Sequence, residues 1–484
     1  MKRSTENWVI GVLAAACLIY IILRAWLLPI THDEGSTIIN HVPRRLFDSL
    51  FYEREANLNN HILNTLAIKA LLGIFPGNQF VVRLPVLVGG CLYLWAGLAL
   101  CRRLSDHALI RLFGVVMLLG NPFLLEFFSL ARGYGLALGL MMMALYQAWR
   151  FLENNKARTL RNAFIFAGLA VYANFTLLLF FMPFSLLLFW AAGQQNRAWA
   201  AFWPITRPAF YTFGIYLLLW ITPVLRLSGG EDFSHWSQLS SNLESIRLLV
   251  DSSVHGHAYL GRNTSIILSW AALVFMFIGG GVAIGQWWRK NKRFAGHPSS
   301  FLAAVFLGAV LVNFLQTKLL HTADLNARVS LFFYPLFAFL LIQVADWLWT
   351  KWVRRSWAFM GPVLLLVLIN NLRCLNLKQS FEWWFDAHTF QVLHKIRSIQ
   401  AAEGRAEPYS FDASWIVLNS FSTHVNEFPQ GYDRVLQHVE WHPNRSPVPG
   451  PDFYFALYEE EAAALGEGYQ VVFKPRKGVL LRKK

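Results

Sequence analysis

Charged residues are scarce in this chain: they make up 15% of its 484 residues, while 55% are hydrophobic. A soluble protein of this length could not bury so much apolar surface. The composition therefore excludes an ordinary water-soluble domain and indicates a polytopic membrane protein.

Acidic residues are fewer than basic ones, 28 against 43, which gives a formal net charge of +15. Such an excess could suggest nucleic-acid binding, but the Lys and Arg residues lie in short connectors between apolar runs. This distribution is typical of membrane proteins with positive cytoplasmic loops. We therefore expect no nucleic-acid partner.

Cysteine is also rare. The four cysteines lie in or at the ends of apolar segments, so neither a disulfide framework nor a cysteine-based metal site is indicated.

The first apolar run, 8–30, follows Lys2 and Arg3 but lacks the small-residue cleavage site of a signal peptide. We expect an uncleaved first span with its N-terminus in the cytoplasm.

Long apolar runs recur along the chain. A transmembrane helix needs about 20 apolar residues, and by this measure we expect about eleven spans, although 162–193 divides into two short and nearly continuous ones. The candidates are 8–30, 82–101, 108–127, 133–152, 162–174, 176–193, 209–228, 264–288, 301–320, 329–350 and 356–377.

The segment 61–76 could be a twelfth span, but it is short and carries Asn64 and Lys69. We predict instead an amphipathic helix lying in the membrane interface. Its apolar face would hold Ile62, Leu63, Leu66, Ala70 and Ile74. If this segment does not cross, the basic connectors all share the side of the N-terminus. If it crosses, they all move outside, which the positive-inside rule disfavours.

Two loops, 31–81 and 229–263, then lie outside the cytoplasm, and the first also carries a predicted amphipathic helix from Val42 to about Tyr52. We assign residues 1–377 to an all-α transmembrane domain that contains both loops.

The composition changes at about residue 378, where the chain becomes polar and rich in proline. Strand-like apolar runs follow, at Trp415–Leu418 and Tyr469–Phe473. We predict a small extracytoplasmic α/β domain over 378–484.

An acidic pair, Asp33 and Glu34, directly follows the first apolar run. It could be the ordinary polar end of a helix, but two carboxylates at the mouth of a membrane segment are costly unless they are used. Further short motifs lie in order on the same predicted outer side. They are Asn60-His61-Ile62-Leu63, Arg83-Leu84-Pro85, Asn121-Pro122, Ser129-Leu130-Ala131-Arg132-Gly133-Tyr134, and Arg328 ahead of Tyr334-Pro335.

Together these motifs resemble those of the GT-C superfamily of membrane glycosyltransferases, in particular the protein O-mannosyltransferase and aminoarabinose transferase (ArnT-like, glycosyltransferase family 39/83) enzymes. The resemblance covers roughly the first 350 residues. It implies a GT-C fold, a lipid-linked sugar donor, an inverting transfer and an active site that faces away from the cytoplasm.

By this resemblance Asp33 is the base that takes the proton from the acceptor, and Glu34 positions Asp33 or the acceptor. The departing polyprenyl phosphate gains charge, which preorganised cations stabilise. The candidate phosphate-binding residues are Arg83, Arg132, Arg328 and Lys318. Each arginine at a span end could instead reach toward lipid headgroups.

Two departures from the family pattern are visible. No acidic residue follows Arg132 within a few positions, which makes a metal site less expected, and the prolines that relatives often carry after His61 are missing, which alters the expected loop geometry. His255 and His257 could be a metal pair, but no third ligand stands at a recognised spacing. We therefore expect no metal and no cofactor. The residues expected to line the donor or acceptor site are His61, Tyr134, Glu53, His255 and His257.

The sequence thus predicts a membrane glycosyltransferase that moves a monosaccharide from a polyprenyl-phosphate donor to a lipid, glycan or protein acceptor. The resemblance, with no obvious retention signal, favours a bacterial inner membrane and a periplasmic site. One alternative is a flippase or transporter of the lipid-linked sugar, which would need mid-membrane charges and repeated halves that the sequence does not show. Another is a catalytically dead scaffold, which the retained acidic pair and arginines disfavour.

Overall fold

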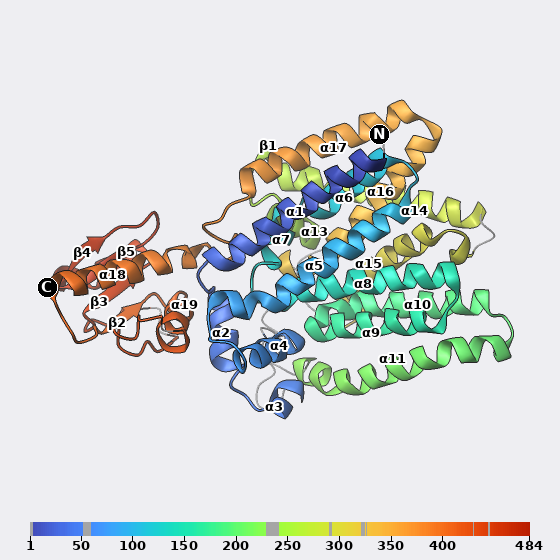
Figure 1. Cartoon of the computed structure of the whole chain (residues 1–484). Helices are drawn as coiled ribbons and strands as arrows, with labels where there is room; N and C mark the ends of the chain where they lie inside the picture. The colour runs from blue at the N-terminus through green and yellow to red at the C-terminus, as the bar shows by residue number, and fades with distance from the viewer. Residues whose placement is uncertain are drawn as a thin grey trace.

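The computed structural model describes residues 3–51, 60–228, 242–289, 293–320, 325, 327–428, 430–443 and 446–484. It consists of a bundle of long helices and a small tail domain with a four-stranded sheet (Figure 1). The N-terminus lies at the end of the bundle away from the tail domain, while α2 (His32–Asn40) and α4 (Ile62–Leu72) lie at the end near it.

Nine helices within the described ranges are long and apolar enough to cross a membrane. They are α1 (Arg3–Leu27), α5 (Gln79–Leu104), α8 (Gly133–Asn154), α10 (Leu178–Gln195), α11 (Trp199–Ser228), α14 (Thr264–Arg289), α15 (Pro298–Leu320), α16 (Phe333–Lys351) and α17 (Val353–Cys374).

Two predicted spans correspond to shorter helices, α6 (Ala108–Leu119) and α9 (Ala157–Ala173). The predicted division of 162–193 is confirmed, since η1 (Phe175–Leu177) separates α9 from α10. The prediction of a continuous helix over 108–127 is wrong. Asn121 accepts a hydrogen bond from the backbone of Leu124 and starts a new helix, α7 (Pro122–Phe127), with Pro122 in its first turn.

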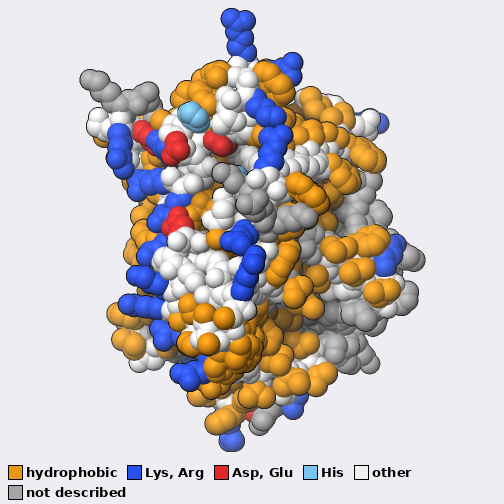
Figure 2. Space-filling model, turned by 90° about the vertical axis from the view of Figure 1, so that its right-hand side faces the viewer, with side chains coloured by type: hydrophobic (Ala, Val, Ile, Leu, Met, Phe, Trp, Pro, Cys, Tyr) orange, Lys and Arg blue, Asp and Glu red, His pale blue; other side chains and the backbone are white. Residues whose placement is uncertain are grey.

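Basic side chains gather at the end of the bundle opposite the tail domain (Figure 2). This end holds the connections from α5 to α6, from α8 to α9 and from α16 to α17. Basic residues such as Arg103, Arg158 and Arg354 lie in the helix ends that flank these connections.

Glycines bring α5 and α8 together in the centre of the bundle. A Cβ added to Gly89 of α5 would lie 2.5 Å from the carbonyl oxygen of Gly135 on α8, and Gly139 packs on Gly89 one turn further along. Small residues four positions apart permit this close backbone approach in membrane helices. This contact fixes the position of the first turn of α8, which belongs to the candidate site.

The first outer loop differs from its prediction. α4 forms, but its buried side carries Asn64 and Thr65, while Ala70 and Ile74 are exposed. The reason is that Asn64 donates to the carbonyl of Ala131 at 3.0 Å, which fixes that side against the bundle. The helix predicted from Val42 is also shorter, because α3 spans only Leu46–Phe51.

The tail domain contains a mixed sheet in the order β2-β3-β5-β4. β2 pairs parallel with β3, and the other two pairs are antiparallel. Its elements are α18 (Thr389–Glu403), β2 (Phe411–Ala413), α19 (Leu418–Ser422), β3 (Phe453–Ala456), α20 (Glu459–Ala464), β4 (Tyr469–Phe473) and β5 (Val479–Lys483).

One predicted strand, Tyr469–Phe473, is confirmed as β4. The strand predicted at Trp415–Leu418 is wrong, because this segment is a turn that leads into α19. Val417, Leu418 and Phe421 are buried together in the core of the domain, so this apolar run packs its side chains from a turn and a helix.

We predict that Gly89→Val separates α5 from α8 and destabilises the bundle by about 1–3 kcal/mol, as other overpacked cores are. A thermal unfolding curve of the purified protein in detergent should show a lower transition temperature. Gly281→Val on α14 is the matched control, because a Cβ added there meets nothing within 4 Å. Equal stability of the two variants would contradict the proposed close contact.

Candidate functional site

The acidic pair lies in the first turn of α2, where its two side chains point in different directions. Glu34 accepts a hydrogen bond from the backbone N–H of Thr31 at 2.9 Å, which closes the turn. Neighbouring residues of a helix point about 100° apart. Glu34 therefore faces into the protein, and Asp33 faces a separate polar cluster.

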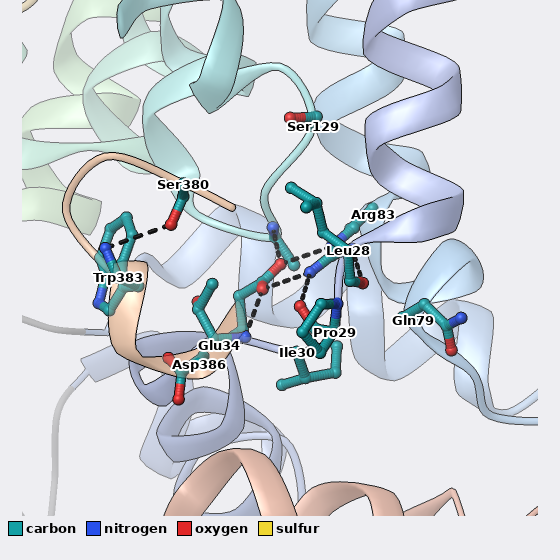
Figure 3. Close-up of polar contacts among 12 residues, drawn as sticks. Leu28, Pro29, Ile30, Glu34, Gln79, Arg83, Ser129, Ser380, Trp383 and Asp386 are labelled. Carbon is teal, nitrogen blue, oxygen red and sulfur yellow. Dashed lines mark hydrogen bonds and ion pairs between the residues drawn. The ribbon is translucent and has the colours of Figure 1, made fainter. Parts of the chain in front are cut away.

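Glu34 forms a buried ion pair with Arg83 of α5 (Figure 3). The two side chains are 0% exposed and make two parallel contacts, Nη2 to Oε2 at 2.7 Å and Nε to Oε1 at 2.8 Å. Burial raises the pKa of Glu34, but Arg83 and backbone N–H donors outweigh this effect and lower it below the usual range. The carboxylate is therefore ionised and fully enclosed.

Arg83 also binds the end of α1. It donates to the carbonyl groups of Ala25 at 3.1 Å, Leu28 at 2.8 Å and Pro29 at 2.7 Å. With the two bonds to Glu34, these contacts use every N–H of the guanidinium, which leaves none for the predicted donor phosphate. We therefore assign Arg83 a structural role: it holds α1, α2 and α5 together.

Asp33 meets the two other predicted arginines. Its Oδ2 lies 3.5 Å from Arg132 and 3.2 Å from Arg328, and its side chain is 14% exposed. Arg132 also donates to the carbonyl of Asp33 and to Thr37 Oγ1, both at 3.2 Å. The structure thus brings Asp33, Arg132 and Arg328 into one cluster. In the sequence, Arg132 follows Asp33 by about 100 residues and Arg328 follows it by about 300.

The charge of Asp33 follows from this cluster. Burial raises the pKa of its carboxyl group, but the positive charges of Arg132 and Arg328 outweigh burial and hold the pKa below its ordinary value. Asp33 is therefore an ionised carboxylate in the ligand-free site.

The sequence analysis did not identify Glu382 or its neighbour Trp383 as site residues. Arg328, in η3 (Ala327–Ser330), donates to Glu382 Oε2 at 2.6 Å and lies over the ring of Trp383, 4.9 Å from its centre. Both residues lie in the segment between α17 and η4 (Trp384–His388). The available signal was an acidic residue beside tryptophans, directly after the last span on the predicted outer side.

A second buried ion pair holds this segment in place. Arg24 of α1 pairs with Glu126 of α7 at 3.0 Å and donates to the carbonyl of Asn376 at 2.6 Å. Glu126 also accepts from the backbone of Phe381 at 2.9 Å. Glu382 follows directly, so its position is fixed from both α1 and α7.

His61 and Tyr134 lie beside the cluster of Asp33, Arg132 and Arg328. His61 begins α4, is 6% exposed, and packs edge-on against Tyr134 with 4.8 Å between ring centres. Burial, with Arg132 and Arg328 nearby, lowers the pKa of His61 far below its usual range, so the imidazole is neutral. Tyr134, Asn174, Thr176 and Arg328 line a small recess.

The remaining predicted residues lie elsewhere. Lys318 is exposed in the last turn of α15, and no described contact joins it to the cluster. Glu53 lies outside the described residues. His255 stacks on Phe381 with 4.8 Å between ring centres, and burial lowers its pKa to about 4. His257 contacts Tyr259 instead. Within the described ranges, His, Cys, Asp and Glu form no group of three or more that could hold a metal ion.

An apolar cavity of about 320 Å³ lies between the helices of the bundle. Its walls come from α13 (Asn242–Ser253), α14, α15, α16 and α17. Ser330, two residues after Arg328, and Tyr334 belong to its lining. The cavity thus reaches the chain two residues after Arg328, although Asp33, Arg132 and Arg328 themselves do not line it.

The tail domain docks on the start of α2. Ser420 donates to the carbonyl of Ile30 at 2.6 Å, and the N–H of Ile30 donates to His424 at 3.1 Å. Asp386, in η4, accepts a hydrogen bond from the N–H of His32 at 2.7 Å. In Figure 3, Asp386 and Trp383 lie on the other side of Glu34 from Arg83. The tail domain therefore contributes to positioning Asp33.

No protein-family model and no curated protein matches the sequence. The crystal structure of ArnT from Cupriavidus metallidurans in the apo state is similar in fold, with 11% identity, a TM-score of 0.50, and coverage of 99% of this chain and 98% of the ArnT chain. ArnT from the same organism bound to undecaprenyl phosphate gives 13% identity, a TM-score of 0.45 and coverage of 98% of each chain. The predicted GT-C fold is confirmed by the likeness to the apo structure.

We predict that Glu34→Gln destabilises the protein by about 3–5 kcal/mol, because it leaves the buried charge of Arg83 uncompensated. Folded yield and unfolding temperature of the purified protein would measure this loss.

The matched control is Glu153→Gln, which removes a half-exposed partner of Arg103 at 3.4 Å and should change stability by less than about 1 kcal/mol. Similar losses in both variants would contradict the structural role of the Glu34 pair.

Proposed function

We propose that this protein is a membrane glycosyltransferase that moves a monosaccharide from a polyprenyl-phosphate donor to a lipid, glycan or protein acceptor. One observation carries the proposal: the Asp33 carboxylate is held between Arg132 and Arg328, and the lining of an apolar cavity includes Ser330, two residues after Arg328. Such an arrangement would supply a base, two cations for a phosphate and, close by, room for a lipid chain. The GT-C fold supports the same conclusion.

The acceptor hydroxyl or phosphate oxygen attacks the anomeric carbon, and the bond from that carbon to the phosphate oxygen breaks. The electron pair of the broken bond leaves with the polyprenyl phosphate. Asp33 takes the proton when the acceptor is a hydroxyl, and attack opposite the leaving group inverts the anomeric centre. A positioned base typically contributes about 10²–10⁴-fold to such a step.

Donor binding would also change the pKa of Asp33 and therefore its strength as a base. In the ligand-free site the two arginines lower its pKa and make it a weak base. A donor phosphate that binds the same arginines offsets their positive charge, so the pKa of Asp33 rises toward the range in which it accepts a proton more readily. The acceptor is then activated only when the donor is present.

Arg132 and Arg328 stabilise the leaving group, because the phosphate gains negative charge as the glycosidic bond breaks. Both guanidinium groups are held by protein contacts before the donor arrives. This preorganisation avoids reorienting the cations during the reaction.

We place the site on the outer face of the membrane, in a bacterium the periplasmic face of the inner membrane. The reason is that the basic connectors gather at the other end of the bundle, which the positive-inside rule assigns to the cytoplasm. The apolar cavity would receive the polyprenyl chain, and the tail domain, docked on α2, would border the acceptor.

We predict that Asp33→Asn reduces sugar transfer by about 10²–10⁴-fold and leaves the protein folded in the membrane. Mass spectrometry of the products, after incubation with a panel of polyprenyl-phosphate sugars and membrane extract, measures transfer. Lys318→Gln is the matched control and should retain activity. A fully active D33N variant would remove Asp33 from the mechanism. Movement of lipid-linked sugar across vesicles without any acceptor would favour a flippase instead.

We predict that Arg132→Lys and Arg328→Lys each lower transfer by about 10²-fold or more, because lysine cannot present the planar fork that binds two phosphate oxygens. Initial rates against donor concentration would show the loss. Arg103→Lys at the other end of the bundle should match the unaltered enzyme, and wild-type rates in both site variants would contradict the phosphate role.

A further inference from the structure

Arg328 is shared by two carboxylates. Its Nη1 donates to Glu382 at 2.6 Å, and its Nη2 lies 3.2 Å from Asp33. A phosphate that binds a guanidinium through two oxygens needs two of its N–H groups at once. In the ligand-free site Glu382 therefore occupies part of the surface of Arg328 that a phosphate would take.

Glu382 can be reached from the site and can move. Its side chain is 17% exposed, and it lies on an irregular segment between α17 and η4. Arg328 also lies over the ring of Trp383 at 4.9 Å, a contact that does not involve Glu382. The hydrogen bond from Phe381 N–H to Glu126 anchors the backbone just before Glu382 and does not involve the Glu382 side chain.

Two arginines face two carboxylates in this cluster. Arg328 from η3 and Arg132 from the start of α8 face Asp33 of α2 and Glu382 itself. Tyr134 of α8 lines the same recess as Arg328 and is an uncharged phenol, the Glu126–Arg24 pair adds no net charge, and His61, just before α4, is neutral. A phosphate therefore meets an excess of positive charge only when one carboxylate is displaced or protonated.

We infer that Glu382 is a positioning residue that holds the phosphate-binding edge of Arg328 in the empty site, is displaced by the donor phosphate, and returns to expel the polyprenyl phosphate after transfer. This inference rests on the proposed function and deepens it. It assigns a role in donor exchange to a residue that follows the last span.

The displaced carboxyl group should take up a proton from water. Burial already raises the pKa of Glu382 even with Arg328 beside it, and the loss of that partner to the phosphate raises it further. Binding of a phosphate is thus coupled to proton uptake and should weaken as the pH rises. The coupling also favours release, because polyprenyl phosphate leaves more readily when Glu382 loses its proton and binds Arg328 again.

Binding of polyprenyl phosphate to the purified full-length protein in detergent tests this inference, with titrations from about pH 6 to about pH 8. The wild-type protein should bind more weakly as the pH rises. Glu382→Gln, which keeps an oxygen for Arg328 but carries no charge, should bind about tenfold more tightly at the upper pH and lose most of the pH dependence. Its multiple-turnover rate should fall while single-turnover transfer persists, because product release slows.

Two further variants separate this role from a structural one. Glu382→Asp keeps the charge and should retain the pH dependence, and Glu153→Gln removes a distant acidic charge and should behave as wild type. If Glu382→Gln binds no more tightly than wild type, or keeps its pH dependence, Glu382 has no role in donor exchange and the proposed function still stands. If the wild-type protein binds no polyprenyl phosphate at any pH, the proposed function fails as well.

Discussion

The buried ion pair between Glu34 and Arg83 is the interaction on which the rest of the site depends. Removing two charges from water is expensive, and only good geometry with further hydrogen bonds compensates for it. Here the guanidinium forms two bonds to the carboxylate and three to backbone carbonyls at the end of α1. The pair therefore fixes the first turn of α2, and the preceding residue, Asp33, faces Arg132 and Arg328.

Two neighbouring carboxylates thus acquire different functions from their surroundings. Glu34 is enclosed and has a single partner arginine, whereas Asp33 is partly exposed and contacts two arginines, one of which also binds Glu382. In a cluster of this kind the carboxylates balance the charge of the arginines. An incoming anion competes with these carboxylates for the same arginines. The same competition links donor binding to the basicity of Asp33 and to the position of Glu382.

The site is assembled from segments that are far apart in the chain: α2, the start of α8, η3 and the linker after α17. The tail domain belongs to this assembly, since Ser420, His424 and Asp386 bind the backbone at the start of α2. Gly35 explains the close fit, because a Cβ there would lie 2.5 Å from the carbonyl oxygen of Asn419. Without the tail domain, the start of α2, which carries Asp33, would therefore lose these contacts.

The sequence alone determined that the protein is a helical membrane protein and where its long helices lie. It also identified Asp33, Arg132 and Arg328 as candidate site residues. These features follow from apolar length, from the placement of charge at span ends, and from short motifs, all of which are local properties. The likeness to ArnT bears out the GT-C fold that those motifs implied.

Only the tertiary structure decided which arginine binds which carboxylate. Arg83 and Arg132 look equivalent in sequence, yet one is enclosed by backbone carbonyls and the other faces Asp33. Glu382 enters the site because Arg24 and Glu126, distant in sequence, hold its linker. The run at Trp415–Leu418 likewise forms a turn and the start of a helix, because this conformation buries Val417 and Leu418 with Phe421 in the core of the tail domain. Charge pairing and packing depend on distances through space, which a linear pattern does not contain.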